Sequence, residues 1–249
     1  MPTELVALAA PVIFLAYGVF GMTGFGAAMV AVPVLVQLMP LQHAVPMVVL
    51  FDLACTFLVG VKNWRKVSAS ELMRVLPWMI VGIVVGTTLL SQLPPKWPLI
   101  ALGLFVLYMC ARNLRAVASG DLAELRSLWA VPFGVIGGVF SALFGTGGPI
   151  YTIYLSRRLT DVDRFRATIS VLILLSGISR AFAFGASGVY SDESIVRLAL
   201  VLLPMALLGV FVGSKVRTKV SQPKLKRLIF LLLAVSGVAV LFKGLSLPA

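Results

Sequence analysis

The sequence predicts an all-α protein: a polytopic bundle of membrane helices arranged as two inverted-topology repeats, each with a Gly-interrupted broken helix or a re-entrant pair. Three observations predict this fold. The composition is too apolar for a soluble domain, and glycine and proline motifs of the first half recur in the second. The basic residues also gather in one set of loops.

The composition indicates a membrane protein. Of the 249 residues, 60% are hydrophobic and 12% are charged, and the mean hydropathy is +1.04. A typical soluble domain is about 45–50% apolar and about 25% charged. Several apolar runs approach the roughly 20 residues that a helix needs to cross a bilayer. We therefore expect a multi-pass protein of a bacterial or archaeal cell membrane, surrounded by the lipid bilayer.

The net charge of +12 does not indicate a nucleic-acid partner. The basic residues lie between apolar runs, and positive loops beside membrane spans are typical of the cytoplasmic side. Cys55 and Cys110 each lie within an apolar run, so no disulfide framework is predicted. Glu4 precedes an apolar stretch longer than a signal peptide, so we expect this stretch to belong to the mature fold.

Motifs of the first half recur in the second half in the same order. Gly24-Phe25-Gly26 matches Gly145-Thr146-Gly147, and each follows an apolar run that contains Gly-Val-Phe. A proline followed by two glycines four residues apart also recurs, as Pro77, Gly82 and Gly86 and as Pro204, Gly209 and Gly213. We expect two membrane repeats, residues 1–113 and 127–249, joined by a cytoplasmic linker over 114–126.

Ten apolar segments are expected to be helices. Two of them, 26–38 and 149–157, are too short to span comfortably, and each begins just after a glycine cluster. Short, Gly- or Pro-interrupted segments at matching places in two halves indicate a transporter binding site. The other segments are 5–21, 43–61, 73–92, 97–113, 127–143, 166–186, 194–214 and 225–244.

The distribution of basic residues among the loops distinguishes two possible membrane topologies. If 5–38 and 127–157 are single broken spans, the basic residues divide almost evenly between the two sides. If each region enters and returns to the same side, the halves are inverted and the N-terminus lies outside. The basic residues then share one side, which the positive-inside rule favours. The halves are also inverted if segments 5–21 and 127–143 cross the membrane fully. Re-entrant and fully crossing segments therefore both stay possible. Four basic residues do not fall on the basic side in the inverted topology: Lys96, Arg180, Arg197 and Lys243.

The two glycine clusters are the first candidates for a binding site. The N-terminus of an interrupted helix exposes backbone N–H groups and the positive end of the helix dipole, which bind anions. In the inverted topology both N-termini point at one central site. Thr146 is expected to cap the second of these helices and Pro149 to occupy its first turn. The clusters are Thr23, Gly24, Phe25 and Gly26, and Gly145, Thr146, Gly147 and Gly148.

Close helix packing is the alternative role for glycines in a membrane bundle, because small residues let helices touch. We favour this packing role for the glycines outside the two clusters, which are Gly82, Gly86, Gly134, Gly138, Gly209 and Gly213.

Arg180 lies within an otherwise apolar segment. A charge at the membrane centre costs at least ~2.5–3.5 kcal/mol, so this side chain should face a cavity or a partner. A guanidinium donates bidentately to a sulfonate, sulfite or carboxylate, which makes Arg180 a candidate anion ligand. Snorkelling toward the outer interface is the alternative.

Four further polar residues are candidates beside Arg180. Asp52, an acid well inside a predicted span, is expected either to pair with Arg180 or to carry a coupling proton. Thr56 lies one turn after Asp52 and Ser176 one turn before Arg180, where both could donate hydrogen bonds to a ligand. Tyr151, on the second short segment, could line a cavity.

No metal-ligand cluster, nucleophile triad or phosphate-binding loop occurs in the sequence, so we predict no metal, no cofactor and no enzymatic activity. The spaced glycines at 21, 24 and 26 lack the strand and the lysine of a nucleotide site. His43 is the lone histidine, near the outer end of a predicted helix.

Two glycine motifs carry a family resemblance: Gly21-Met22-Thr23-Gly24-Phe25-Gly26 followed by Val32-Pro33-Val34-Leu35, and Gly138-Val139-Phe140 followed by Gly145-Thr146-Gly147-Gly148-Pro149. With these motifs, the duplicated halves and the basic loops, nearly the whole chain resembles the TauE/SafE family of sulfite exporter-like proteins, also called TSUP. The chain has Ala27-Ala28 where many members continue with glycine. The resemblance implies a transporter of small organosulfur or other organic anions, often in the export direction.

Residues and resemblance together predict a secondary transporter that exports a small anion such as sulfite, a sulfonate or thiosulfate by alternating access. Protons are the candidate coupling ion, with Asp52 as the coupling residue, and a homo-oligomer is a candidate state. The alternative is a passive anion channel, which the same helix ends and arginine would serve.

Overall fold

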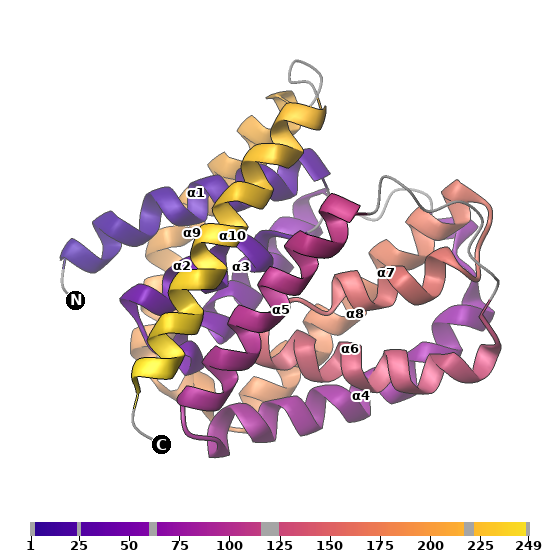
Figure 1. Cartoon of the computed structure of the whole chain (residues 1–249), viewed down its shortest axis with the longest axis horizontal. Coiled ribbons are helices and arrows are strands. Elements are labelled where there is room, and N and C mark those ends of the chain that lie inside the picture. Colours follow the sequence, from indigo (N-terminus) through magenta and orange to yellow (C-terminus); the bar gives the residue numbers. More distant parts are fainter. Residues whose placement is uncertain (1–2, 24–25, 60–63, 116–124, 217–221, 248–249) are drawn as a thin grey trace. The chain divides into compact units, whose positions relative to one another are not determined.

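A computed structural model describes residues 3–23, 26–59, 64–115, 125–216 and 222–247. Within these ranges every regular element is helical, which confirms the predicted all-α fold (Figure 1). The helices are α1 (Thr3–Thr23), α2 (Ala27–Leu38), α3 (Leu41–Val59), α4 (Ala69–Gln92), α5 (Lys96–Arg115), α6 (Ala130–Phe144), α7 (Gly148–Ser156), α8 (Val162–Ala186), α9 (Glu193–Val216) and α10 (Gln222–Ser246), with short 3₁₀ turns η1 (Trp64–Lys66), η3 (Ser127–Trp129) and η4 (Val189–Ser191).

The described part of the chain contains five helical segments that are long and apolar enough to cross a membrane. Two of them, Glu4–Met22 and Ser127–Phe144, cover the regions whose full crossing the sequence left open, and their lengths suit a full crossing. Large apolar side chains such as Phe182 and Phe211 are exposed on these helices, as lipid-facing residues are. The protein is therefore a multi-pass membrane protein. The other three segments are Ala69–Gln92, Val162–Ala186 and Glu193–Val216.

The chain forms two compact units, and each unit combines segments that are distant in the sequence. Unit 1 consists of Met1–Phe51, Gln92–Ser119 and Asp192–Ala249, and unit 2 consists of Asp52–Ser91 and Gly120–Ser191. Both units thus draw on both halves of the chain. The sequence repeats 1–113 and 127–249 are a different division, and they stay a prediction.

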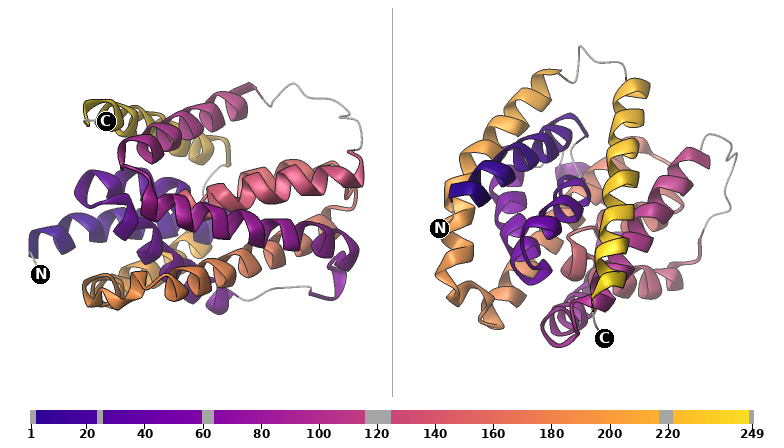
Figure 2. Two further views of the ribbon diagram at one scale, coloured as in Figure 1. Left: turned by 90° about the horizontal axis from the view of Figure 1, so that it is seen from below. Right: turned by 60° about the vertical axis from the view of Figure 1, so that its left-hand side comes forward.

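In unit 1, α1 packs along α9, and α10 packs along α5 (Figures 1 and 2). The contact between α1 and α9 depends on glycine: a Cβ on Gly213 would overlap the carbonyl oxygen of Gly18, and a Cβ on Gly209 would lie 3.0 Å from the Gly18 nitrogen. The Tyr17 hydroxyl of α1 donates to the Val48 carbonyl of α3 over 3.1 Å, in a buried position. The glycines thus allow α1 and α9 to approach closely, and the hydrogen bond of Tyr17 holds α3 against α1.

In unit 2, α4 packs along α6 through an equivalent set of glycines (Figure 2, left). A Cβ on Gly138 would lie 2.9 Å from the Cα of Gly82, and a Cβ on Gly134 would lie 2.7 Å from the Cβ of Trp78. By the sequence repeat, Gly82 matches Gly209. The packing role predicted for the glycines outside the two clusters is confirmed.

Candidate functional site

Arg180 is the centre of a polar site within unit 2. Its side chain is 4% exposed, so it is buried and does not snorkel. The guanidinium donates from Nε to the Ser176 carbonyl, from Nη1 to the Ser141 carbonyl and from Nη2 to Asp52 Oδ2, each over 3.4 Å. All three contacts are long for charge-assisted hydrogen bonds, which usually measure about 2.7–2.9 Å. The guanidinium is thus surrounded by acceptors without being tightly bound.

Asp52, on α3, is the carboxylate that faces this guanidinium. Its side chain is 17% exposed, and its Oδ2 lies 3.4 Å from Arg180 Nη2. The pairing of these two residues was one of the two roles expected for Asp52. Removal of one partner from a buried ion pair costs about 3–5 kcal/mol, because the other charge stays buried without compensation. Each charge therefore depends on the other for its place in the interior.

Three hydroxyl groups lie beside Arg180. The Oγ atoms of Ser141 on α6 and Ser176 on α8 are 2.7 Å apart and share a hydrogen bond in the interior. Tyr151 on α7 is 1% exposed, and its hydroxyl lies beside both serines without a hydrogen bond of ordinary geometry to any described residue. The sequence had indicated Ser176 and Tyr151. It had not indicated Ser141, whose only signal was a hydroxyl in an apolar helix.

The break between α6 and α7 places Tyr151 beside the serines. Gly145 ends α6 in the left-handed region with φ 70°, and its N–H donates to the Ser141 carbonyl over 2.8 Å, a glycine C-cap. A Cβ on Gly147 would lie 2.8 Å from the Ser141 Cβ and 3.0 Å from the Tyr151 ring. The broken helix predicted here is therefore present, and only glycine fits the close contact at 147.

The local capping of α7 differs from the prediction. The N-cap is Gly147, without a side-chain hydrogen bond, and Pro149 lies in the first turn as expected. The buried Thr146 Oγ1 has no hydrogen-bond partner among the described residues. The prediction that Thr146 caps α7 is wrong, because the chain enters the helix one residue later. Gly148 is less constrained, because an added Cβ would meet only the Ile173 side chain, at an ordinary 3.7 Å.

The first glycine cluster belongs to unit 1 and is only partly described. Gly26 adopts φ 92° at the N-cap of α2, which requires glycine. Thr23 is the last residue of α1, but its side chain, with Gly24 and Phe25, lies outside the described residues. The anion-binding role of this cluster therefore stays a prediction. Thr56 lies one turn after Asp52 in α3 and is half-buried.

A second buried charged cluster surrounds Glu71 at the start of α4. The Glu71 side chain is 5% exposed; it accepts from Arg74 Nη1 over 2.6 Å and from Arg158 Nη2 over 2.8 Å. The Tyr154 hydroxyl also donates to it, over 2.7 Å, and Arg158 Nη1 donates to the Leu125 carbonyl over 3.0 Å. The predicted span 73–92 begins two residues after Glu71, so the sequence did not indicate Glu71 as a buried acid.

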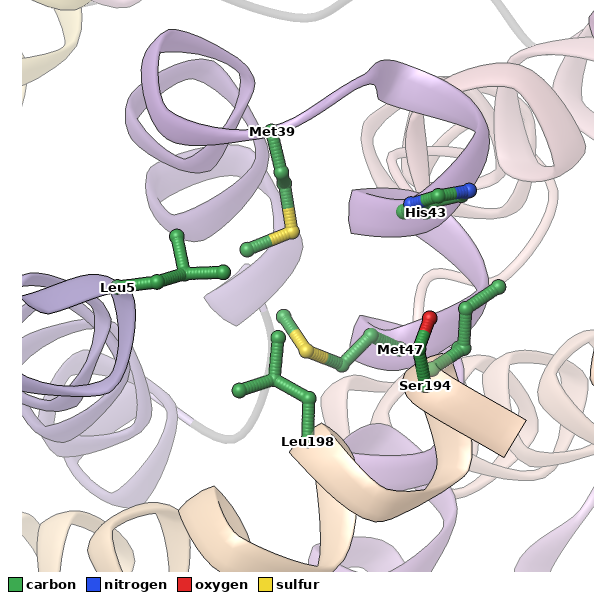
Figure 3. A pocket seen from close by; sticks show the side chains of 7 residues that line it. Leu5, Met39, His43, Met47, Ser194 and Leu198 are labelled. Carbon is green, nitrogen blue, oxygen red and sulfur yellow. The ribbon is translucent and has the colours of Figure 1, made fainter. Parts of the chain in front are cut away.

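A pocket of about 200 Å³ lies within unit 1, where α1, α2, α3 and α9 begin or end (Figure 3). Leu5, Met39, Met47 and Leu198 point into it, and Ser194 lies at its edge. His43 also lines the pocket, and its Nε2 lies 3.7 Å from Asp192 Oδ2.

Hydrogen bonds from the Ser194 side chain and backbone, and the nearby His43, lower the pKa of Asp192. The carboxylate is therefore ionised at neutral pH and available to His43. In the described ranges no group of three His, Cys, Asp or Glu residues is placed to hold a metal ion.

A bundle of membrane-length helices with a charged site beside a broken helix defines a class of protein, the polytopic membrane transporters. A sequence profile described as "Sulfite exporter TauE/SafE" matches residues 9–240. The chain belongs to this transporter family, as its glycine motifs had indicated.

Two relatives support this membership. The chain is 33% identical over 194 residues to "Probable inner membrane transporter protein TsaS" of Comamonas testosteroni, a match that covers 78% of this chain and 80% of that protein. It is 25% identical over 233 residues to "Probable sulfite/organosulfonate exporter TauE" of Cupriavidus necator, covering 90% and 89%. No solved structure matches the chain significantly.

Proposed function

We propose that the protein is a secondary transporter that exports a small organosulfur or organic anion, such as sulfite, a sulfonate or thiosulfate, across the cell membrane. One observation carries the proposal: a buried guanidinium, that of Arg180, lies beside the hydroxyls of Ser141, Ser176 and Tyr151. The printed names of the two relatives, an inner membrane transporter and a sulfite/organosulfonate exporter, support the cargo class.

The geometry at Arg180 suits exchange of one anion for another. A guanidinium carries five N–H donors in a planar fork that fits the oxygens of a sulfonate or carboxylate. Asp52 Oδ2 lies 3.4 Å from Nη2, which is long for an ion pair, so an incoming anion can compete with it for this donor. The Tyr151 hydroxyl and the two serines would then supply neutral hydrogen bonds to the remaining oxygens of the anion.

The inverted topology extends this proposal to the whole chain. In it, the repeats 1–113 and 127–249 are joined by the cytoplasmic linker 114–126 and insert with opposite orientations. The N-termini of the helices after Gly26 and Gly147 would both contribute positive dipole ends to the anion. The concentration of basic residues in one set of loops supports this arrangement.

Proton coupling follows if Asp52 and the anion share Arg180. Protonation of Asp52 removes its charge and frees the guanidinium, so a proton and an anion would bind together and move in the same direction, which is outward when the anion's own gradient drives export. We expect uptake of a monoanion into proteoliposomes to be accelerated by acid on the side of uptake. Asp52→Asn, which mimics the protonated residue, should transport without this response to pH. An unchanged response in Asp52→Asn would exclude Asp52 as the coupling residue.

A passive channel is the second candidate function, because a buried arginine would also serve anion permeation. A secondary transporter accumulates the anion against its gradient when a pH gradient is imposed and the membrane potential is clamped. A channel only dissipates the anion gradient under these conditions. Accumulation under a clamped potential therefore separates the two functions.

The cargo class is tested by ligand-induced thermal stabilisation of the purified protein. Sulfite, thiosulfate, short sulfonates and small carboxylates are compared with chloride at the same ionic strength. A ligand at 100 times its Kd stabilises the folded state by about 2.7 kcal/mol, which raises the midpoint by several degrees. If none of these anions shifts the midpoint beyond chloride, the proposed cargo class is wrong.

A further inference from the structure

The Glu71 cluster fastens the short helix α7 to the start of α4. Tyr154 lies in the last turns of α7, and Arg158 follows its end by two residues. Both side chains donate to the Glu71 carboxylate, over 2.7 and 2.8 Å. Arg158 also reaches the Leu125 carbonyl. The C-terminal end of α7 is thus held by one buried carboxylate on a neighbouring helix.

The same helix carries part of the anion site at its other end. Tyr151 precedes Tyr154 by one turn, and Gly147, the N-cap of α7, packs directly against Ser141. With nine residues, α7 is about 13 Å long at 1.5 Å per residue. A helix this short moves as a rigid piece, so any displacement at Tyr154 displaces Tyr151 and uncovers Ser141.

Unit 1 shows that the fold does not require this charged cluster. Leu198 lies eleven residues before Gly209, as Glu71 lies eleven residues before Gly82, so the two occupy equivalent places in α9 and α4. Leu198 lines the apolar pocket of unit 1 (Figure 3). The equivalent place is therefore open and apolar in one unit and filled by charge in the other.

Neighbouring residues support this equivalence. Leu5 precedes Gly18 by thirteen residues, as Leu125 precedes Gly138. Met47 and Ile195 line the pocket of unit 1, and their equivalents Thr168 and Ser68 are joined in unit 2 by a buried 2.9 Å hydrogen bond. Leu5, Met47, Ile195 and Leu198 of the pocket thus match Leu125, Thr168, Ser68 and Glu71 of unit 2, the last of which carries the charge of the cluster.

We propose that Glu71 is a positioning residue for transport: through Tyr154 and Arg158 it holds α7 over the anion site, and release of these contacts opens the site to the side of the basic loops. This inference rests on the proposed function, because it assigns the site at Arg180 to the cargo. Buried ion pairs are weak contributors to stability, which agrees with the apolar equivalent in unit 1. The charge at Glu71 serves to hold a movable element.

The proposed inverted topology also places Arg74 and Arg158 on the side of the basic loops. The Arg74 side chain, which is 46% exposed, contacts Glu71 from the more exposed side, whereas the Arg158 side chain is 18% exposed. Two guanidiniums around one carboxylate leave a net positive charge at this entrance, which attracts an anion. An anion that arrives here competes with Glu71 for the arginines, and so weakens the hold on α7.

The test measures exposure of the surface that α7 covers. A single thiol is placed there with Ser141→Cys, in a chain that carries Cys55→Ala and Cys110→Ala, and its reaction with an impermeant maleimide is followed from each side of oriented vesicles. We expect Glu71→Gln to increase labelling from the side of the basic loops by about tenfold, which corresponds to about 1.4 kcal/mol. Labelling from the opposite side should not rise.

Two variants make the result specific. Asp163→Asn is the matched control, because Asp163 accepts from Lys66 over 2.6 Å in an exposed ion pair of the same unit that does not involve α7. It should leave labelling unchanged. Tyr154→Phe removes one contact to Glu71 without altering its charge, and should give a smaller increase; this variant also covers the case in which Glu71→Gln does not fold.

Unchanged labelling in folded Glu71→Gln or Tyr154→Phe would overturn the proposal, and so would an equal increase in Asp163→Asn, which would indicate general loosening. The measurement needs no substrate. Its outcome is therefore independent of the anion and of the Arg180 binding test, so failure of this inference and failure of the proposed function are distinguishable.

Discussion

Arg180→Ala is expected to abolish anion binding and transport while the protein still inserts into the membrane. The guanidinium is the positive group that the structure places beside Ser141, Ser176 and Tyr151. Hydrogen bonds to charged groups contribute about 1.5–3 kcal/mol each, so the loss of a bidentate contact weakens binding at least about 100-fold. The measurement is the affinity of the best anion for purified protein, by calorimetry, and its uptake into proteoliposomes.

The same substitution leaves Asp52 buried without its partner, which costs about 3–5 kcal/mol of stability. This loss of stability must be separated from the loss of binding. Asp52→Asn in the Arg180→Ala chain removes the uncompensated charge, so the double variant should regain thermal stability but not affinity. Arg180→Lys keeps the charge and loses the planar fork, so it should bind with intermediate affinity. Full affinity in stable Arg180→Ala would reject the assignment of the anion site.

The sequence predicted pairing with Arg180 as one of two roles for Asp52, because neither charge is tolerated alone in an apolar interior. It could not predict Ser141, which lies 39 residues from Arg180 and becomes a neighbour only through the packing of α6 on α8. Glu71 was missed for a related reason. Its partners Tyr154 and Arg158 come from another part of the chain, and no local pattern marks a carboxylate in the first turn of a helix as buried.

The helices and the broken segment after Gly145 could be predicted, because long apolar runs and interrupting glycines are local signals. The two compact units could not be predicted from the sequence. Recurrent glycines at 82 and 209 indicated close packing but did not name the partner helices, and the structure pairs α4 with α6 and α1 with α9. The two halves of the chain are consequently interleaved in both units, which a comparison of motifs along the sequence does not reveal.

Positions that match in the two repeats can have different chemical surroundings in the two units. Leu198 and Glu71 lie in matching places, yet one lines an apolar pocket and the other is surrounded by arginine and tyrosine donors. In the inverted topology that we propose, alternating access would open the protein toward opposite sides through such matching places. Different chemistry at the two places would give the two openings different barriers, with the charged closure at Glu71 on the side of the basic loops.

Equivalent glycines also differ in what they tolerate, and Gly138→Ala is expected to destabilise the protein strongly. A Cβ at Gly138 would overlap the Met79 carbonyl oxygen and lie 2.9 Å from the Cα of Gly82 and from the Ile83 nitrogen. All three atoms belong to the backbone of α4, which cannot adjust without separating the helices. Overpacking of this kind typically costs about 1–3 kcal/mol, and Gly138→Val should prevent recovery of folded protein.

Gly18 provides the matched control for Gly138, because it occupies the equivalent place in the first half, in the other Gly-Val-Phe motif. A Cβ on Gly18 would meet only the Gly209 carbonyl oxygen, at an ordinary 3.8 Å. Gly18→Ala should therefore be tolerated, with a gain in helix propensity of up to about 1 kcal/mol. Thermal unfolding of the purified variants in detergent measures the difference. Equal midpoints for Gly18→Ala and Gly138→Ala would contradict the packing of α4 on α6, since the repeat alone makes the two positions alike and only the structure distinguishes them.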